Sequence, residues 1–121
     1  MAWDMDSDRP IYAQLVERIK MQIVSGYYPC GAKMPSVREL AAEAAVNPNT
    51  MQRAFAELER SGLILTQRTN GRTVTEDRAL VEGVRHDMAG GHVNTFVDRM
   101  RELGYTGDEI LTLLKEVLGN E

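Results

Sequence analysis

Apolar residues recur every four positions near the start of the chain, which predicts a helix with one buried stripe. Asp8 is an N-cap candidate and Pro10 falls in the first turn, so we expect this helix to begin near residues 8–10. Ser25-Gly26 is typical of a helix end. The residues of the stripe are Ile11, Leu15, Ile19 and Ile23.

Two shorter amphipathic segments follow, and each carries its own start signal. Ser36 and Glu39 have the spacing of a capping box, in which the serine oxygen accepts from a first-turn amide and the glutamate reaches back. Asn47 followed by Pro48 is a favoured pair for a helix start, and Ser61-Gly62 ends that helix. The inward apolar positions are Val37, Leu40, Ala41 and Ala44 in the first segment, and Met51, Ala54, Phe55 and Leu58 in the second.

The spacing of these two helices predicts a helix-turn-helix, whose second helix enters the major groove of DNA. Ala41 is small where the helices would cross, and Ala45 stands at the turn position that usually holds glycine. The apolar residues expected to lock the two helices together are Leu40, Ala44, Val46, Met51 and Ala54.

A β-hairpin is predicted next. Residues 63–68 and 72–76 are rich in Thr, Val, Ile and Leu, and Asn70-Gly71 is a preferred pair at the centre of a two-residue type I′ turn. The predicted fold is therefore mainly α with a small β-hairpin. It is a winged helix-turn-helix over residues 8–76, followed by a two-helix dimerisation tail over residues 77–121.

The tail carries a near-heptad apolar pattern that stays in phase across Gly90-Gly91. This favours one long helix with a weak point at the glycine pair, and a real break there is the competing interpretation. Gly104 is placed to end the helix, and Thr106 with Glu109 is another capping box. The helix that follows is apolar on too wide a face to lie alone in water. Its apolar residues are Ile110, Leu111, Leu113, Leu114, Val117 and Leu118.

The net charge of -4 is unevenly distributed. Residues 1–78 hold ten basic and ten acidic side chains, whereas residues 79–121 hold four basic and eight acidic ones. Between Arg60 and Thr75 the sequence has three arginines and no acid. We therefore expect a positive field around the hairpin and no acidic partner for Arg68 or Arg72.

Several classes of protein are excluded by composition and motifs. No apolar run approaches the roughly 18–20 residues that span a bilayer, and the first ten residues lack the apolar stretch of a signal peptide. A single cysteine, Cys30, suits a reducing cytoplasm. We find no phosphate loop and no nucleophile motif, so the sequence predicts neither an enzyme nor a cofactor. His86 and His92 lack the i,i+4 spacing of a helical metal site, and no metal is predicted.

A set of residues between about 10 and 76 forms one pattern: Pro10-Ile11-Tyr12, Gly26, Gly31, residues 35–41, Thr50, Ala54, Leu58, Gly62 and Gly71. In this pattern the segment resembles the DNA-binding domain of the GntR family of bacterial transcription regulators. The short two-helix tail and residues 47–54 are similar to the YtrA subfamily, which implies a dimer built on the tail helices and often a gene beside a membrane-transporter operon. Pro48, Cys30 and the wing tip at residues 69–71 depart from the family pattern, since many members have arginine, proline and two glycines there.

The outer N-terminal half of the second motif helix is expected to read the major groove. Asn49 and Gln52 carry amides that can pair with adenine, and Arg53 can contact guanine or phosphate. We expect Thr50 to contact phosphate.

Two helix starts and the hairpin supply the remaining candidates for DNA contact. Ser36 and Asn47 lie at helix N-termini, which favour phosphate. The resemblance implies a DNA contact for Arg38, with a solvated helix charge as the alternative. Arg68 and Arg72 are expected along the minor groove, the alternative being solubilisation of an edge hairpin. The candidate DNA-binding residues are Ser36, Arg38, Asn47, Asn49, Thr50, Gln52, Arg53, Arg68, Asn70, Gly71 and Arg72.

The tail is the candidate dimer interface, because its apolar surface exceeds what one neighbouring helix can cover. We expect a homodimeric repressor of a palindromic double-stranded DNA operator, with no dedicated effector pocket in the tail. The alternative is a winged-helix module for protein assembly, which would more often expose an apolar patch on the outer helix face. The candidate interface residues are Val81, Val84, Met88, Phe96, Met100, Leu103, Ile110, Leu113, Leu114 and Val117.

Overall fold

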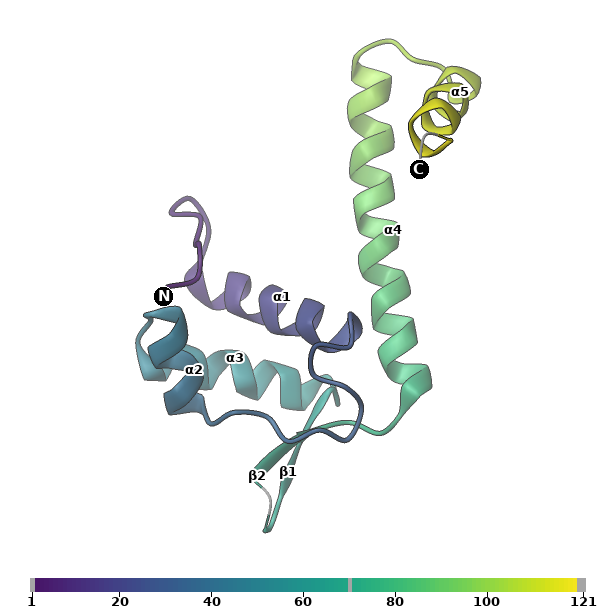
Figure 1. Ribbon diagram of the computed structural model, residues 1–121. Helices are drawn as coiled ribbons and strands as arrows, with labels where there is room; N and C mark the ends of the chain where they lie inside the picture. Colours follow the sequence, from purple (N-terminus) through teal and green to yellow (C-terminus); the bar gives the residue numbers. More distant parts are fainter. Residues whose placement is uncertain (1, 70, 120–121) are drawn as a thin grey trace. The chain divides into compact units, whose positions relative to one another are not determined.

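The computed structural model describes residues 2–69 and 71–119, which divide between Arg85 and His86 into two compact units, unit 1 up to Arg85 and unit 2 from His86. The predicted fold class, mainly helical with one antiparallel hairpin, is confirmed. The domain boundary between residues 76 and 77 stays a prediction. The elements in chain order are α1 (Ile11–Val24), α2 (Val37–Ala44), α3 (Pro48–Arg60), β1 (Ile64–Gln67), β2 (Gly71–Val74), α4 (Arg78–Glu102) and α5 (Gly107–Leu118) (Figure 1).

The start of α1 differs from the expected one. The helix begins at Ile11, Pro10 is its N-cap, and no side chain caps it, so the assignment of Asp8 as the cap is wrong. The reason is Gln14, a buried side chain that holds the backbone leading into the helix. Its Nε2 donates to the carbonyl oxygens of Asp6 at 2.6 Å and Arg9 at 3.0 Å, and its Oε1 accepts from the Asp6 amide at 2.6 Å.

The core of unit 1 lies where α3 packs against α1, α2 and the first strand. Phe55 and Leu58 on α3 are fully buried, as are Leu15 and Ile19 on α1. Trp3 joins this core from the N-terminal arm and is only 8% exposed. Its Nε1 donates to Glu43 on α2 at 2.9 Å, and the Arg18 guanidinium lies 4.7 Å from its ring centroid.

The turn between α2 and α3 has the expected caps and one strained residue. Both hydrogen bonds of the Ser36–Glu39 capping box are present, and the Asn47 side chain accepts from the amide of Asn49 at 2.8 Å. Between them, Ala45 adopts φ 60° and ψ 49°, which is the left-handed region. This conformation costs a residue with a β-carbon about 1–2 kcal/mol, whereas glycine adopts it freely.

The hairpin is confirmed, but its turn is not the two-residue type I′ turn that was expected. Gln67 pairs with Gly71, so three residues (68–70) connect the strands. Gly71, the first residue of β2, has φ 69°, a left-handed conformation that glycine adopts without the strain of a β-carbon. Asn70 lies outside the described residues. On the other edge of β2, the amide of Met34 donates to Arg72 O and that of Val74 to Ala32 O, both at 2.8 Å.

The helix α4 runs unbroken through Gly90-Gly91, so the single long helix is confirmed and the break is wrong. Gly104 ends it with φ 91°, and Thr106 and Glu109 form the expected capping box at the start of α5. In unit 2, Met100 and Ile110 are buried. None of the described helices combines the length and apolarity that crossing a bilayer requires.

The strain at Ala45 predicts that removing its β-carbon will stabilise the folded protein. Ala45→Gly relieves the left-handed conformation, so we expect the free energy of unfolding to rise by about 1 kcal/mol, less a few tenths for the more flexible unfolded chain. Urea unfolding followed by circular dichroism measures the change. Ala42→Gly, at an exposed interior position of α2, is the matched control and should lower stability by about 0.5–1 kcal/mol. Destabilisation by Ala45→Gly would contradict the turn geometry.

Candidate DNA-binding surface

The outer face of α3 in its first two turns is polar and open to solvent. Asn49, Gln52 and Arg53 are exposed, while Met51 and Ala54 between them are fully buried. Thr50 is half-buried. The helix therefore presents amide and guanidinium groups on one side and fills the core with the other. This is the arrangement by which a recognition helix presents its N-terminal residues to base edges.

Arg53 is held in place by Tyr12, a half-buried residue of α1. The Arg53 guanidinium lies 4.3 Å from the centroid of the Tyr12 ring. The Tyr12 hydroxyl in turn donates to Glu57 Oε1 at 3.3 Å, one turn further along α3. Stacking fixes the guanidinium plane and leaves its N–H edge free to donate, which reduces the entropy lost when it binds an acceptor.

The start of α2 is the second part of the surface. Ser36 Oγ accepts from the Glu39 amide at 3.0 Å, and the Ser36 amide donates to Glu39 Oε1 at the same distance. These bonds from Ser36 lower the pKa of the Glu39 carboxyl, with a smaller contribution from the charge of Lys33. Arg38 is exposed beside this cap.

Lys33 is a residue that sequence reasoning missed. It forms a β-bridge with Thr73 and lines a hollow of about 300 Å³ between the start of α2 and the wing. Ser36, Gly71 and Arg72 line the same hollow. The signal in the sequence is a lone lysine two residues before Pro35, which becomes informative only when the bridge to β2 is known.

The two wing arginines differ from one another. Arg68 is exposed, whereas the Arg72 side chain is only 27% exposed and its Nε lies 3.0 Å from Glu59 Oε1 on α3. The expectation that Arg72 has no acidic partner is therefore wrong, because the acid comes from a distant part of the sequence. Arg60 also forms an ion pair, with its Nη1 2.6 Å from Glu57 Oε1. The positive field expected around the hairpin is reduced accordingly.

The carboxyl of Glu59 is the centre of a small cluster. Its Oε2 accepts from the Thr66 hydroxyl at 2.6 Å. That hydrogen bond, followed by the hydrogen bond and the positive charge of Arg72, lowers the pKa of Glu59, so the group is ionised at neutral pH.

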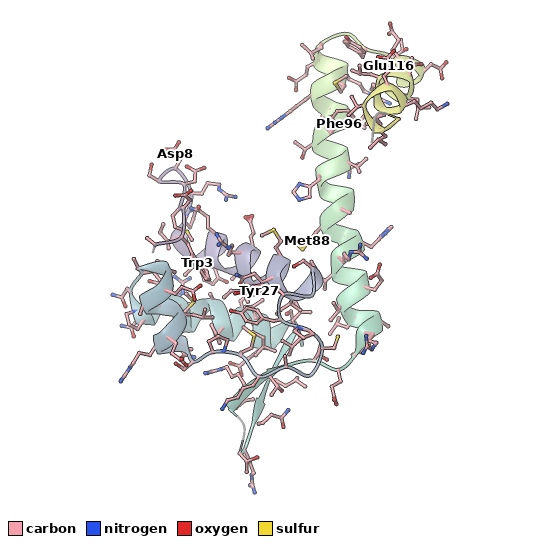
Figure 2. The ribbon with its side chains drawn as sticks, viewed as in Figure 1. Trp3, Asp8, Tyr27, Met88, Phe96 and Glu116 are labelled. Carbon is pink, nitrogen blue, oxygen red and sulfur yellow. The ribbon has the colours of Figure 1, made fainter. Side chains whose placement is uncertain are left out.

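The candidate interface residues fall into three environments. Val81 is buried in the core of unit 1, with Val84 half-buried against it, and in unit 2 Met100 and Ile110 are buried. Leu103 is 73% exposed. Figure 2 labels Phe96 on α4. The half-buried members are Met88, Phe96, Leu113 and Leu114, and the exposed ones are Leu103 and Val117.

Sequence reasoning left three exposed apolar residues out of that interface. Val93, Leu111 and Leu118 are 58%, 56% and 60% exposed. Leu111 and Leu118 are seven residues apart on α5, so they lie on the same side of the helix. His86 and His92 are exposed, and within residues 2–69 and 71–119 no cluster of three His, Cys, Asp or Glu could hold a metal.

Comparison with known proteins gives matches over most of the chain. The sequence profile described as "Bacterial regulatory proteins, gntR family" matches residues 11–74. The HTH-type transcriptional repressor YtrA of Bacillus subtilis is 44% identical over 82 residues, which cover 66% of this chain and 63% of that protein.

Two solved structures show the same fold. A GntR family transcriptional regulator from Listeria monocytogenes is 41% identical, with a TM-score of 0.86 over 93% of this chain and 98% of that one. The DNA-binding domain of AraR in complex with operator ORX1 is 27% identical, with a TM-score of 0.53 over 62% of this chain and 93% of that one. These relatives are regulators rather than enzymes, as the sequence predicted. The chain belongs to the GntR family of bacterial regulatory proteins, which are DNA-binding transcription regulators with a winged helix-turn-helix.

Proposed function

We propose that this chain is a homodimeric repressor that acts by occupying a two-fold symmetric operator. The observation that carries the proposal is the outer face of α3, where Asn49, Gln52 and Arg53 are exposed over a fully apolar inner face. A module for protein assembly would instead present apolar groups there. The similarity to a protein named as a repressor supports the same choice. A regulator of this kind acts on the chromosome and therefore in the cytoplasm.

Each part of the surface has a role in the proposed complex. Asn49 and Gln52 read base edges in the major groove, and Arg53 donates to guanine or phosphate from its stacked position. Thr50 contacts phosphate.

The α2 start and the wing position the protein on the duplex. Ser36, Asn47 and Arg38 contact phosphates at the two helix N-termini, where the helix dipole favours anions. Arg68 contacts the backbone or minor groove from the wing, and Gly71 sets the path of the wing tip.

The proposed dimer is built on unit 2. Its exposed apolar side chains on α4 and α5 each gain about 1.5–3 kcal/mol on burial, and one copy of unit 2 leaves them in water. An isologous pairing of two copies covers them and creates the two-fold axis that a palindromic site matches. We leave Val81 out of this interface because it is buried within unit 1. The residues proposed to meet the second copy are Val93, Phe96, Leu103, Leu111, Leu113, Leu114, Val117 and Leu118.

The proposed function first predicts the form of the DNA site. A duplex selected from a random pool should contain two inverted half-sites with centres about 10 bp apart, because each copy of α3 enters one major groove on the same side of the DNA. Affinity measured by fluorescence anisotropy should fall steeply with salt, since phosphate contacts release counterions. Selection of a single half-site, or affinity independent of salt, would contradict the scheme.

A second prediction separates base reading from phosphate contact. Gln52→Ala should cost about 1–3 kcal/mol of binding at one base pair of the site and little at variants that already lack that pair. Arg68→Ala should weaken all variants by a similar factor and reduce the salt dependence by about one phosphate contact. The measurement is a panel of single-base variants of the selected duplex. An equal loss at every variant for Gln52→Ala would remove it from the base readers.

The third prediction tests the interface. Leu111→Glu combined with Leu118→Glu places charges on the exposed apolar side of α5, so the protein should become monomeric in sedimentation experiments and lose affinity for the two-half-site duplex. Thr112→Glu, at an exposed position on the polar side of α5 beside Asp108 and Glu116, is the control and should remain dimeric. A double variant that is still dimeric with unchanged affinity would place the interface elsewhere.

A further inference from the structure

One carboxylate connects the recognition helix to both strands of the wing. Thr66 on β1 donates to Glu59 Oε2 at 2.6 Å, and Arg72 on β2 donates from Nε to Glu59 Oε1 at 3.0 Å. Thr66 and Arg72 are directly opposite one another in the strand register. Each oxygen of Glu59 is therefore used by one strand, at the same rung of the hairpin. We call Glu59, Thr66 and Arg72 the wing clasp.

Arg72 makes a second contact with the same face of α3. Its Cζ lies 5.4 Å from the ring centroid of Phe55, which is fully buried and one helical turn before Glu59. The guanidinium is thus placed by an aromatic face and a carboxylate from consecutive turns of α3. Charge-assisted bonds of this kind are stronger than neutral ones. With side chains only 27% and 30% exposed, the pair is also less screened than an open surface ion pair.

The backbone of Arg72 is held from the opposite edge. Its carbonyl accepts from the Met34 amide at 2.8 Å, in the loop that leads into α2. An isolated two-stranded hairpin is marginally stable in water, so its position depends on what anchors it. Here β2 is fixed through its backbone by the α2 loop and through a side chain by α3.

We propose that Arg72 is a positioning residue rather than a DNA contact, and that the wing clasp sets the angle between the wing and α3. This rests on the proposed function, in which α3 and the wing bind one duplex. The charge of Arg72 is already neutralised by Glu59, so the wing meets phosphate through Arg68. The charge of Arg72 becomes available to DNA only when the carboxylate of Glu59 is removed.

The salt dependence of binding tests this assignment, because its slope reports how many cationic side chains contact phosphate. Each phosphate contact contributes about 0.9 to the slope of log affinity against log salt concentration. With a mixed-sequence duplex as the probe, Arg68→Gln should lower the slope by about that amount, whereas Arg72→Gln should leave it unchanged. The two variants remove the same charge from the same hairpin and are matched controls for one another.

The Glu59→Gln background gives the decisive comparison. Removing the carboxylate frees Arg72, so in this background Arg72→Gln should lower the slope by about 0.9, the effect that is absent beside an intact Glu59. If Arg72→Gln lowers the slope equally in both backgrounds, Arg72 contacts phosphate directly and the proposal is overturned.

The clasp can also be observed without DNA and without a substitution at Arg72. In nitrogen-15 spectra of the wild-type protein, the Arg72 Nε–H should exchange slowly with solvent, and the rate should rise in Glu59→Gln. Fast exchange in the wild-type protein would show that the clasp does not form. If the protein binds no duplex but Arg72 Nε–H is protected, the proposed function fails while the clasp stands.

Discussion

Burial of the inner face of α3 is the constraint on which the rest of unit 1 depends. Phe55 and Leu58 are fully enclosed, with α1 and α2 on two sides and β1 on a third. Fully burying such side chains contributes about 1.5–3 kcal/mol each, which is large beside the net stability of a small domain. The polar residues on the other face of α3 therefore have fixed positions, since the helix cannot rotate without exposing its apolar face.

The two halves of α3 use their polar groups differently. The first turns carry no acid, and their exposed Asn49, Gln52 and Arg53 face solvent. The C-terminal half carries Glu57 and Glu59, and both are used inside the protein. Glu57 accepts from the Tyr12 hydroxyl and from Arg60, and Glu59 accepts from the wing. Placing the acids at the far end keeps negative charge away from the turns that meet phosphate, and it uses that charge to hold neighbouring elements.

Local signals in the sequence were sufficient for the helices and the hairpin. Both capping boxes and the Asn47 cap depend on residues within one turn, and all three form as predicted. The start of α1 was not predictable in this way. Gln14 reaches back as far as Asp6, eight residues earlier, and holds the segment up to Arg9 outside the helix, so the first helical residue follows Pro10 rather than Asp8. The predicted length of the hairpin loop was wrong for a related reason, because strand register depends on both strands together rather than on the Asn70-Gly71 pair.

In the candidate site, too, local features were predicted and contacts between residues far apart in the sequence were not. Which residues of α3 face outwards follows from helical periodicity, so exposed Asn49, Gln52 and Arg53 were identified. Arg72 and Glu59 are 13 residues apart in the sequence and meet only through the packing of the wing on α3. A count of charges along the sequence therefore treated Arg72 as unpaired. Lys33 was missed because its bridge to Thr73 is equally non-local.

In the proposed complex, the N-terminal half of α3 reads the duplex while the wing lies beside it. Nuclear magnetic resonance mapping of the protein during titration with the selected duplex tests this directly. We expect the largest amide shifts at residues 47–53, at the start of α2 and at the wing, with small shifts in α5. Shifts concentrated in α5, with residues 47–53 unchanged, would contradict it.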